Sequence, residues 1–286
     1  MHLRFVKMHG IGNDFIMVDA IDPADRGLLD LSRRHAVSLC DRKFGVGADG
    51  VIVILPAPGS DADFRMVIYN SDGSESEMCG NGIRCFAKYV YDRGYKPSVT
   101  QRVLTGRGVL TTTVALESRQ VASVQVDMGE PILSRSEIPV SLPGNPTEPV
   151  IDHDLEVDGI NYRVTCVSMG NPHCIVFVDG DVDRIPLVDI GPKFEHHSAF
   201  PNRINTEFVQ VLGPSEIRMR VWERGAAETL ACGTGACASA VASALNERTD
   251  CEVDVHLAGG DLRIDWRDDG HVMMTGPAVS VFEGTI

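Results

Sequence analysis

The stretch that organises this chain is Asn70-Ser-Asp-Gly-Ser-Glu-Ser-Glu-Met-Cys79-Gly-Asn-Gly-Ile-Arg84. Its pattern returns as Glu223-Arg-Gly-Ala-Ala-Glu-Thr-Leu-Ala-Cys232-Gly-Thr-Gly-Ala-Cys237. In both copies a polar residue precedes a cysteine by nine positions, and Gly-x-Gly follows that cysteine. A strand-like segment precedes each copy and an apolar helical run follows it. The repeat predicts two equivalent units, each with a thiol at the N-terminus of a helix.

The repeat extends upstream of both cysteines. Asn13 lies in a turn 66 residues before Cys79, and Asn171 lies in a turn 61 residues before Cys232. An apolar run with the character of a strand follows each turn. Because a solenoid needs three or more repeats, two copies favour a pseudo-symmetric pair of domains. A length of 286 residues also fits about two domains of ordinary size.

Hydrophobic spacing predicts few helices and many strands. Helices are expected over residues 28–41, from Gly80 to a C-terminal turn at Gly94, and over residues 236–245. Strands are expected at residues 4–8, 15–19, 51–55, 64–69, 109–115, 121–126, 162–168, 174–178, 217–222, 252–257, 262–266 and 272–282. Since strand and helix do not alternate regularly, the pattern predicts an α+β fold.

Two segments without regular periodicity also carry expectations. Gly45-Val-Gly47-Ala-Asp-Gly50 matches the dinucleotide-binding spacing, but a helix precedes it and a strand follows it. A dinucleotide site needs the opposite order, so we expect a turn that brings backbone close to another group. Residues 131–149 contain five prolines and are expected to form a surface connection.

Composition limits the partners of the chain. The formal net charge of −14 argues against binding to nucleic acid or to an anionic membrane surface. No apolar run approaches the roughly 20 residues of a membrane-spanning helix, and the N-terminus does not resemble a signal peptide. We therefore expect a cytoplasmic protein whose eight cysteines stay reduced.

The two glycine-flanked cysteines are the strongest candidates for chemistry. A helix N-terminus carries about half a positive charge, which can lower a thiol pKa to roughly 3.5–7.5. The Gly-x-Gly that follows leaves backbone N–H groups open to a carboxylate or an enolate oxygen. Two such thiols, facing each other across a cleft, would suit the movement of a proton between the two faces of one carbon. Taken singly, a cysteine is more often a small buried hydrophobe, which we expect of Cys40, Cys166, Cys174 and Cys251.

A redox or zinc-binding protein without catalytic activity is the alternative from another class. The pairs Cys79/Cys85 and Cys232/Cys237 could supply four thiolates. Structural zinc usually spaces paired cysteines by two to four residues, so the first pair is too wide and the second is borderline. We therefore expect no metal site.

These motifs resemble those of the diaminopimelate epimerase family. The family signature Asn-x-Asp-Gly-Ser-x4-Cys-Gly-Asn-Gly-x-Arg matches residues 70–84, and its second cysteine motif matches residues 223–235. His-Gly-x-Gly-Asn-Asp-Phe matches residues 9–15, and Met-Gly-Asn-Pro-His matches residues 169–173. The resemblance runs from Lys7 to Pro277, and four motifs in the same order are highly specific.

The resemblance implies a cofactor-independent isomerase that interconverts LL- and meso-diaminopimelate, a step in lysine and peptidoglycan biosynthesis. It implies that Cys79 and Cys232 are the acid and base, with His173 and Glu223 as supporting groups. Each supporting residue alone would more often be an ordinary turn or strand-end residue. The substrate-binding positions implied by the resemblance are Asn13, Asn70, Gly80, Asn81, Asn171, Asn205, Glu223, Arg224, Gly233 and Thr234.

The resemblance also implies the architecture. Each domain is expected to be a β-barrel-like sheet around a central helix, with the active site in the cleft between the domains. The C-terminal strand is expected to return to the first domain, so the predicted domains are residues 1–119 plus 275–286 and residues 120–274. A homodimer is the expected assembly.

Two features of the sequence bear on substrate specificity. Some family members carry a glutamine among their substrate ligands where this chain has Gly50. A related cofactor-independent racemase of the proline or hydroxyproline type is the alternative enzyme. Glu223 and Arg224, expected to meet a second charged amino-acid end, favour diaminopimelate over such a small substrate.

Overall fold

The computed structural model of the chain describes residues 3–59 and 61–286. Contacts divide the chain into two compact units, Met1–Asp127 with Thr275–Ile286 and Met128–Met274. Strands outnumber helices in both units, which confirms the predicted α+β class. The strand over residues 120–127 lies in the first unit because it pairs with the strand before it. The predicted domain boundary after residue 119 stays a prediction.

The first unit contains nine strands, two α-helices and a short 3-10 helix among the described residues. Its elements are β1 (Arg4–Gly10), β2 (Asn13–Asp19), η1 (Pro23–Asp25), α1 (Gly27–Cys40), β3 (Gly50–Pro56), β4 (Phe64–Asn70), β5 (Glu75–Ser76), α2 (Gly80–Asp92), β6 (Thr100–Thr105), β7 (Gly108–Glu117), β8 (Gln120–Asp127) and β18 (Val279–Thr285).

The second unit has the same order of elements around its own helix. Its elements are β9 (Val150–Val157), β10 (Ile160–Ser168), β11 (Pro172–Phe177), η2 (Val182–Arg184), α3 (Leu187–Glu195), β12 (Asn205–Gly213), β13 (Glu216–Glu223), β14 (Ala227–Thr229), α4 (Gly233–Leu245), β15 (Glu252–Leu257) and β16 (Gly260–Trp266). The next strand, β17 (Val272–Gly276), carries the chain back toward the first unit.

Strand pairing repeats between the units. In the first unit β1 and β2 are antiparallel, β2 and β3 are parallel, and β3 and β4 are antiparallel. In the second unit β10 and β11, β11 and β12, and β12 and β13 pair in the same three senses. The last strand, β18, pairs antiparallel with β1 of the first unit. The predicted two-fold repeat is therefore present in the topology.

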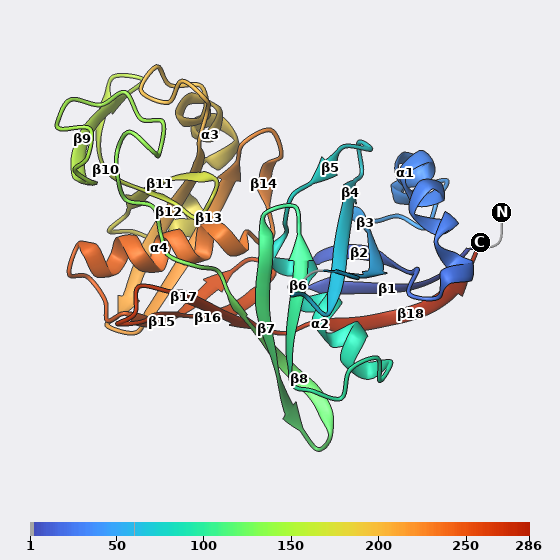
Figure 1. Ribbon diagram of the computed structural model, residues 1–286. Helices are drawn as coiled ribbons and strands as arrows, with labels where there is room; N and C mark the ends of the chain where they lie inside the picture. Colours follow the sequence, from blue (N-terminus) through green and yellow to red (C-terminus); the bar gives the residue numbers. More distant parts are fainter. Residues whose placement is uncertain (1–2, 60) are drawn as a thin grey trace. The chain divides into compact units, whose positions relative to one another are not determined.

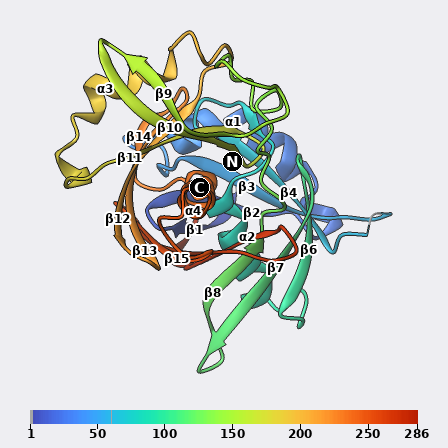
Figure 2. The same ribbon diagram turned by 90° about the vertical axis from the view of Figure 1, so that its left-hand side faces the viewer.

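Each unit holds one helix against the inner face of its strands. Helix α2 contacts β1, β2, β3, β7 and β8, and α4 contacts β10 to β13, β15 and β16 (Figure 1). Figure 2 shows α4 nearly end-on, with β12, β13 and β15 curving around it. This is the predicted arrangement of a curved sheet around a central helix in each unit.

The two central helices achieve burial with different side chains. Helix α2 buries the stripe Ile83, Phe86, Ala87 and Val90, and it ends before Gly94, whose positive φ of 69° suits a helix C-terminus. Helix α4 is lined by alanine, serine, cysteine and valine on nearly every side. Such small side chains let strands approach the helix axis closely, so α4 is buried all round.

Some elements differ from the sequence prediction. Helix α3 was not predicted, nor were strands β5, β6, β9, β12 and β14. One strand was predicted over residues 272–282, where the structure has the two strands β17 and β18. The proline-rich segment is more than a surface connection, because Ile138 and Val140 belong to the apolar core of the second unit. The described part of the chain contains no helix that is both long and apolar enough to cross a membrane.

Candidate active site

Cys79 caps the N-terminus of α2. Its backbone is extended, with φ −139° and ψ 120°, and its Sγ accepts a hydrogen bond from the Gly82 N–H at 3.4 Å. A Cβ on Gly82 would lie 2.8 Å from the Ile52 side chain, so only glycine fits there without a shift. The Gly-x-Gly spacing thus allows the helix to begin directly after the thiol.

Two asparagines surround this thiol. The Cys79 thiol donates to Asn13 Oδ1 at 3.5 Å, and Asn81 Nδ2 donates to the same oxygen at 3.2 Å. Asn13 Nδ2 in turn donates to Asp49 Oδ2 at 2.8 Å, which fixes the direction of the amide. The structure therefore brings Cys79, Asn13 and Asn81 together and adds Asp49, which the sequence analysis did not single out.

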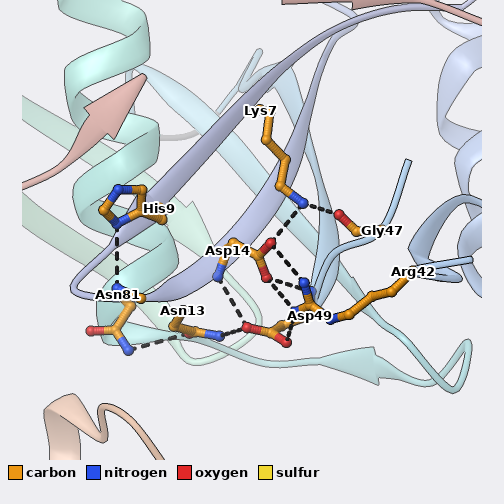
Figure 3. Close-up of polar contacts among 9 residues, drawn as sticks. Lys7, His9, Asn13, Asp14, Arg42, Gly47, Asp49 and Asn81 are labelled. Atoms are coloured by element: carbon orange, nitrogen blue, oxygen red, sulfur yellow. Dashed lines mark hydrogen bonds and ion pairs between the residues drawn. The ribbon is translucent and has the colours of Figure 1, made fainter. Parts of the chain in front are cut away.

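Asp49 belongs to a network of charges behind Asn13 (Figure 3). Arg42 Nη2 lies 2.7 Å from both Asp14 Oδ1 and Asp49 Oδ1, and Lys7 Nζ lies 2.7 Å from Asp14 Oδ2. Lys7 also donates to the Gly47 carbonyl. The glycine-rich segment that was predicted to be a close-approaching turn thus supplies both the Gly47 carbonyl and the Asp49 carboxylate.

The Asp14 carboxylate gives this network a pH dependence. Burial opposes its ionisation, but hydrogen bonds from Arg42 and Lys7 outweigh burial and lower the pKa from 3.8 to about 2. A carboxyl whose pKa is lower in the folded state stabilises the fold above the unfolded pKa, and that contribution is lost as pH falls through the folded value.

We expect Asp14→Asn to lower the free energy of unfolding by about 1–2 kcal/mol at pH 7, allowing for partial exposure. The difference from the wild type should shrink between about pH 4 and pH 2. Calorimetric melts of both proteins over the acid range would measure it. A difference that stayed constant down to pH 3 would contradict a role for the Asp14 charge.

Cys232 occupies the equivalent N-cap position of α4. Its backbone is extended, with φ −121° and ψ 106°, and its Sγ lies 3.5 Å from Thr234 Oγ1. Asn171 Nδ2 donates to Thr234 Oγ1 at 3.2 Å. Cys232, Thr234 and Asn171 therefore form one cluster in the second unit, and the thiol is buried.

The environment of Cys232 opposes the expected effect of the helix N-terminus. Burial raises its pKa well above the ordinary thiol value, and the nearby carboxylates of Glu223 and Glu207 raise it further. Dehydration and negative charge outweigh the positive end of the helix here. Cys232 is therefore held as a protonated thiol, contrary to the lowered pKa expected from its position.

His173 pairs with a residue that sequence reasoning missed. Its Nδ1 lies 2.6 Å from Glu207 Oε1, and both side chains are fully buried. Burial raises the pKa of Glu207, an effect that His173 partly offsets. The only sequence signal was a glutamate directly before the apolar pair Phe208-Val209, in a strand that was not predicted.

The remaining predicted residues of the second unit lie where β13 ends. The Glu223 carboxylate accepts from Thr229 Oγ1. Asn205 is buried, donates to the Pro172 carbonyl at 3.0 Å and accepts from the Arg224 N–H at 2.8 Å. Asn205 thereby fixes the backbone of Arg224, whose exposed side chain reaches the Asn202 carbonyl at 3.0 Å.

Four other positions that the sequence analysis singled out are placed as follows. Gly80 and Gly233 are the first residues of α2 and α4, directly after the cysteines. Asn70 ends β4 and donates to Ser74 Oγ at 2.9 Å, within its own turn rather than toward Cys79. Gly50 faces Asn70 across β3 and β4, and a Cβ there would lie 2.9 Å from the Tyr69 carbonyl, so any side chain would force a shift.

The second cysteine of each motif lies inside a central helix. Cys85 and Cys237 lie inside α2 and α4 and are fully buried, and burial raises the pKa of Cys85 to about 12. Residues 3–59 and 61–286 contain no cluster of three or more metal-ligating side chains. Cys40, Cys166 and Cys174 are buried as expected, whereas Cys251 is exposed.

Solved structures share the fold at low sequence identity. A hydroxyproline epimerase from Agrobacterium vitis superposes with a TM-score of 0.69 and 15% identity, covering 100% of this chain and 91% of the other. A phenazine biosynthesis protein of the PhzF family from Bacillus anthracis gives a TM-score of 0.68 and 17% identity, covering 100% and 99%. At such identities the likeness concerns the fold alone.

Sequence relatives are much more similar. A diaminopimelate epimerase from Moorella thermoacetica is 54% identical over 284 residues, covering 99% of this chain and 98% of the relative. One from Synechococcus elongatus is 53% identical over 286 residues, covering 100% and 99%. A chloroplastic diaminopimelate epimerase from Oryza sativa is 51% identical over 290 residues, covering 99% and 80%.

The family model described as diaminopimelate epimerase matches residues 5–134 and 165–281. These ranges include both cysteine motifs and both turn asparagines. Together with the relatives that match along almost the whole chain, this match shows that the protein belongs to the diaminopimelate epimerase family, a family of isomerases.

Proposed function

We propose that this chain interconverts LL- and meso-diaminopimelate without a cofactor, with Cys79 and Cys232 as its acid and base. The observation that carries the proposal is that equivalent positions of the two repeats place a thiol at the N-cap of a central helix. Relatives described as diaminopimelate epimerases match along almost the full chain, which supports the proposal.

The reaction requires one proton to leave the α-carbon and another to arrive on the opposite face. A thiolate removes the α-proton and becomes a thiol, while the second thiol donates its proton and becomes a thiolate. The C–H electron pair passes through a carbanion delocalised into the carboxylate. Since an amino-acid α-proton is far less acidic than a thiol, that developing charge must be stabilised.

The helix N-termini are the groups that suit this stabilisation. We assign the backbone N–H groups of Gly80, Asn81, Gly233 and Thr234 to the reacting carboxylate. Hydrogen bonds from these four N–H groups to the developing negative charge, in a site that excludes water, would supply much of the rate enhancement. His173 and Glu223 would assist and orient the thiols.

The protonation of Cys232 suggests which residue acts first. The raised pKa of Cys232 holds this residue as the thiol, so it suits the proton donor of the resting enzyme. In the direction that begins with Cys232 protonated, Cys79 would remove the α-proton. After one turnover the roles are exchanged, and the next substrate of opposite configuration restores them.

The distal amino-acid end of the substrate needs polar and charged partners. We assign Asn13, Asn70, Asn171 and Asn205 with Glu223 and Arg224 to substrate binding. Support comes from the placement of Asn13 beside Cys79 and of Asn171 in the Cys232 cluster. In this structure Asn70 bonds within its own turn, so it would have to turn toward the substrate.

The direct test uses LL-diaminopimelate in D2O with reduced, metal-free protein and no added pyridoxal phosphate. We expect meso product that carries deuterium at the α-carbon. Chiral chromatography would identify the meso product, and mass spectrometry would measure its deuterium. Neither product nor exchange from a folded, reduced sample would overturn the proposal. Proline and 4-hydroxyproline, assayed in parallel, would reveal a racemase of the alternative type.

Asp49 provides a test of how Asn13 is positioned. We expect Asp49→Ala to lower kcat/KM for diaminopimelate about tenfold, mainly by raising KM, because a hydrogen bond to a charged acceptor contributes about 1.5–3 kcal/mol. Asp61→Ala, which removes an exposed carboxylate of the same unit, is the matched control. A KM within twofold of wild type for Asp49→Ala would contradict this role.

Two broader expectations complete the proposal. We place the enzyme in the cytoplasm, where its thiols would stay reduced, and we propose a homodimer as its assembly. Light scattering after size exclusion would give the mass in solution. A mass of one chain, 31.0 kDa, over the working concentration range would overturn the dimer.

A further inference from the structure

The buried pair of His173 and Glu207 lies beneath the first turn of α4. His173 on β11 faces Asn205 on β12, and Glu207 is two residues further along β12. Nδ1 and Oε1 are 2.6 Å apart, and neither side chain is exposed. A Cβ on Gly235 would lie 2.6 Å from Glu207 Oε1 and 3.2 Å from Cys232 Sγ. The carboxylate and the thiol thus border the same small space under the helix.

In the first unit, apolar side chains occupy the position that corresponds to this pair. Phe15 on β2 faces Gly50 on β3, and Ile52 is two residues further along β3. A Cβ on Gly82 would lie 2.8 Å from Ile52 Cδ1 and 3.5 Å from Phe15 Cζ. By strand register and by position under the helix, Phe15 and Ile52 correspond to His173 and Glu207.

The comparison shows that the fold does not need a polar pair here. Burying an ionisable pair carries a large desolvation cost, and an apolar pair of similar size is often as stable or more stable. The pair is also incompletely satisfied, since His173 Nε2 and Glu207 Oε2 have no hydrogen-bond partner among the described residues. The second unit thus buries an ionisable pair that is costly and not fully hydrogen-bonded, whereas the first unit buries an apolar pair. This difference favours a chemical role for His173 and Glu207 over a role in packing.

We propose that Glu207 is a positioning residue of the epimerase reaction, an inference that rests on the proposed function. Its carboxylate accepts the Nδ1–H of His173, which fixes the ring and leaves the Nε2 lone pair as the atom available for proton transfer. The reverse arrangement, a protonated Glu207 donating to Nδ1, would place the hydrogen on Nε2 instead. The orientation of the pair therefore decides whether His173 can accept a proton.

Glu207 also distinguishes the two thiols. Its negative charge is one cause of the raised pKa of Cys232, after burial and Glu223. At the equivalent place beside Cys79, the side chains nearest to Gly82, apart from Cys79 itself, are the hydrocarbon groups of Ile52 and Phe15. Glu207, at the position that Ile52 occupies in the first repeat, therefore has two effects. It fixes the imidazole of His173, and it helps to keep the Cys232 thiol protonated.

The kinetic test compares Glu207→Gln with Ile52→Val, a small change at the equivalent place in the first unit. Glutamine keeps the size of glutamate, but its amide can either donate or accept and so does not fix the ring. We expect Glu207→Gln to lower kcat about 100-fold with KM within threefold, as when an oriented histidine loses its carboxylate. Ile52→Val should stay within about threefold of wild type.

A second measurement does not depend on activity. Nitrogen-15 NMR of histidine-labelled protein, with His173 assigned through His173→Gln, reports which ring nitrogen carries the hydrogen. We expect the Nδ1–H form in wild type and a mixture, or the Nε2–H form, in Glu207→Gln. Melting temperatures of all variants would show that the comparison concerns folded proteins.

The outcomes separate the two proposals. A kcat for Glu207→Gln within threefold of wild type, or Nε2–H in wild type, would overturn the role of Glu207 while leaving the epimerase proposal intact. A wild type that turns over no diaminopimelate would overturn the proposed function instead. The NMR result would then still decide whether Glu207 holds His173 through Nδ1–H.

Discussion

Cys79→Ala and Cys232→Ala are each expected to lower the rate of diaminopimelate epimerisation by about 10²–10⁴-fold, the usual contribution of a positioned acid or base. Removing either thiol leaves one face of the α-carbon without a proton donor or acceptor. The loss should appear in kcat, because neither Sγ is needed to hold the distal end of the substrate. Chiral separation of the product gives the rate.

Controls make the cysteine result specific. Cys251→Ala removes an exposed thiol of the second unit and should leave the rate unchanged. Circular dichroism and melting temperature would confirm that both alanine variants are folded. If either variant kept more than a tenth of the wild-type rate, the two-base mechanism would be wrong. If both lost the rate, solvent-deuterium exchange from each stereoisomer would show which thiol acts first.

Arg84→Met is expected to lower the free energy of unfolding by about 3 kcal/mol. The Arg84 guanidinium is fully buried and donates to the Gly80 carbonyl at 3.0 Å, to Asn81 Oδ1 at 2.9 Å and to the Pro277 carbonyl at 3.2 Å. Each acceptor left without its partner costs about 1–3 kcal/mol, partly offset because methionine is easier to bury. Urea denaturation would measure the change.

The same substitution should also disturb the first turn of α2, which carries Gly80 and Asn81 beside Cys79. Arg93→Met is the matched control, since Arg93 lies at the other end of α2 and forms an exposed pair with Glu283 at 2.7 Å. An exposed pair contributes about 0–1 kcal/mol, so this variant should be nearly as stable as wild type. A loss below 1 kcal/mol for Arg84→Met would show that the buried guanidinium does not hold the turn.

Local sequence patterns predicted the central helices and most strands. The stripe from Ile83 to Val90 defines α2, and the small residues after Gly235 define α4. The repeat of cysteine and Gly-x-Gly predicted that each helix begins directly after a thiol. These features depend on residues close in the chain, where helical spacing and glycine conformation decide the outcome.

Other features could not be found in this way. Strand β12 lies beside β11 with 27 residues between them, and only that pairing brings Glu207 to His173. Asp49 reaches Asn13 through the parallel pairing of β2 and β3. In both cases a carboxylate becomes significant because of a neighbour distant in sequence, and no local pattern specifies that neighbour.

The sequence alone therefore determined the two-fold repeat, the α+β class, the position of each thiol at a helix N-terminus and the resemblance to the family. The tertiary structure decided the environment of those thiols. A helix N-terminus lowers a thiol pKa, yet burial with Glu223 and Glu207 nearby raises that of Cys232. Helix position can be read from adjacent residues, whereas dehydration and long-range charge exist only once distant strands have packed around the sulfur.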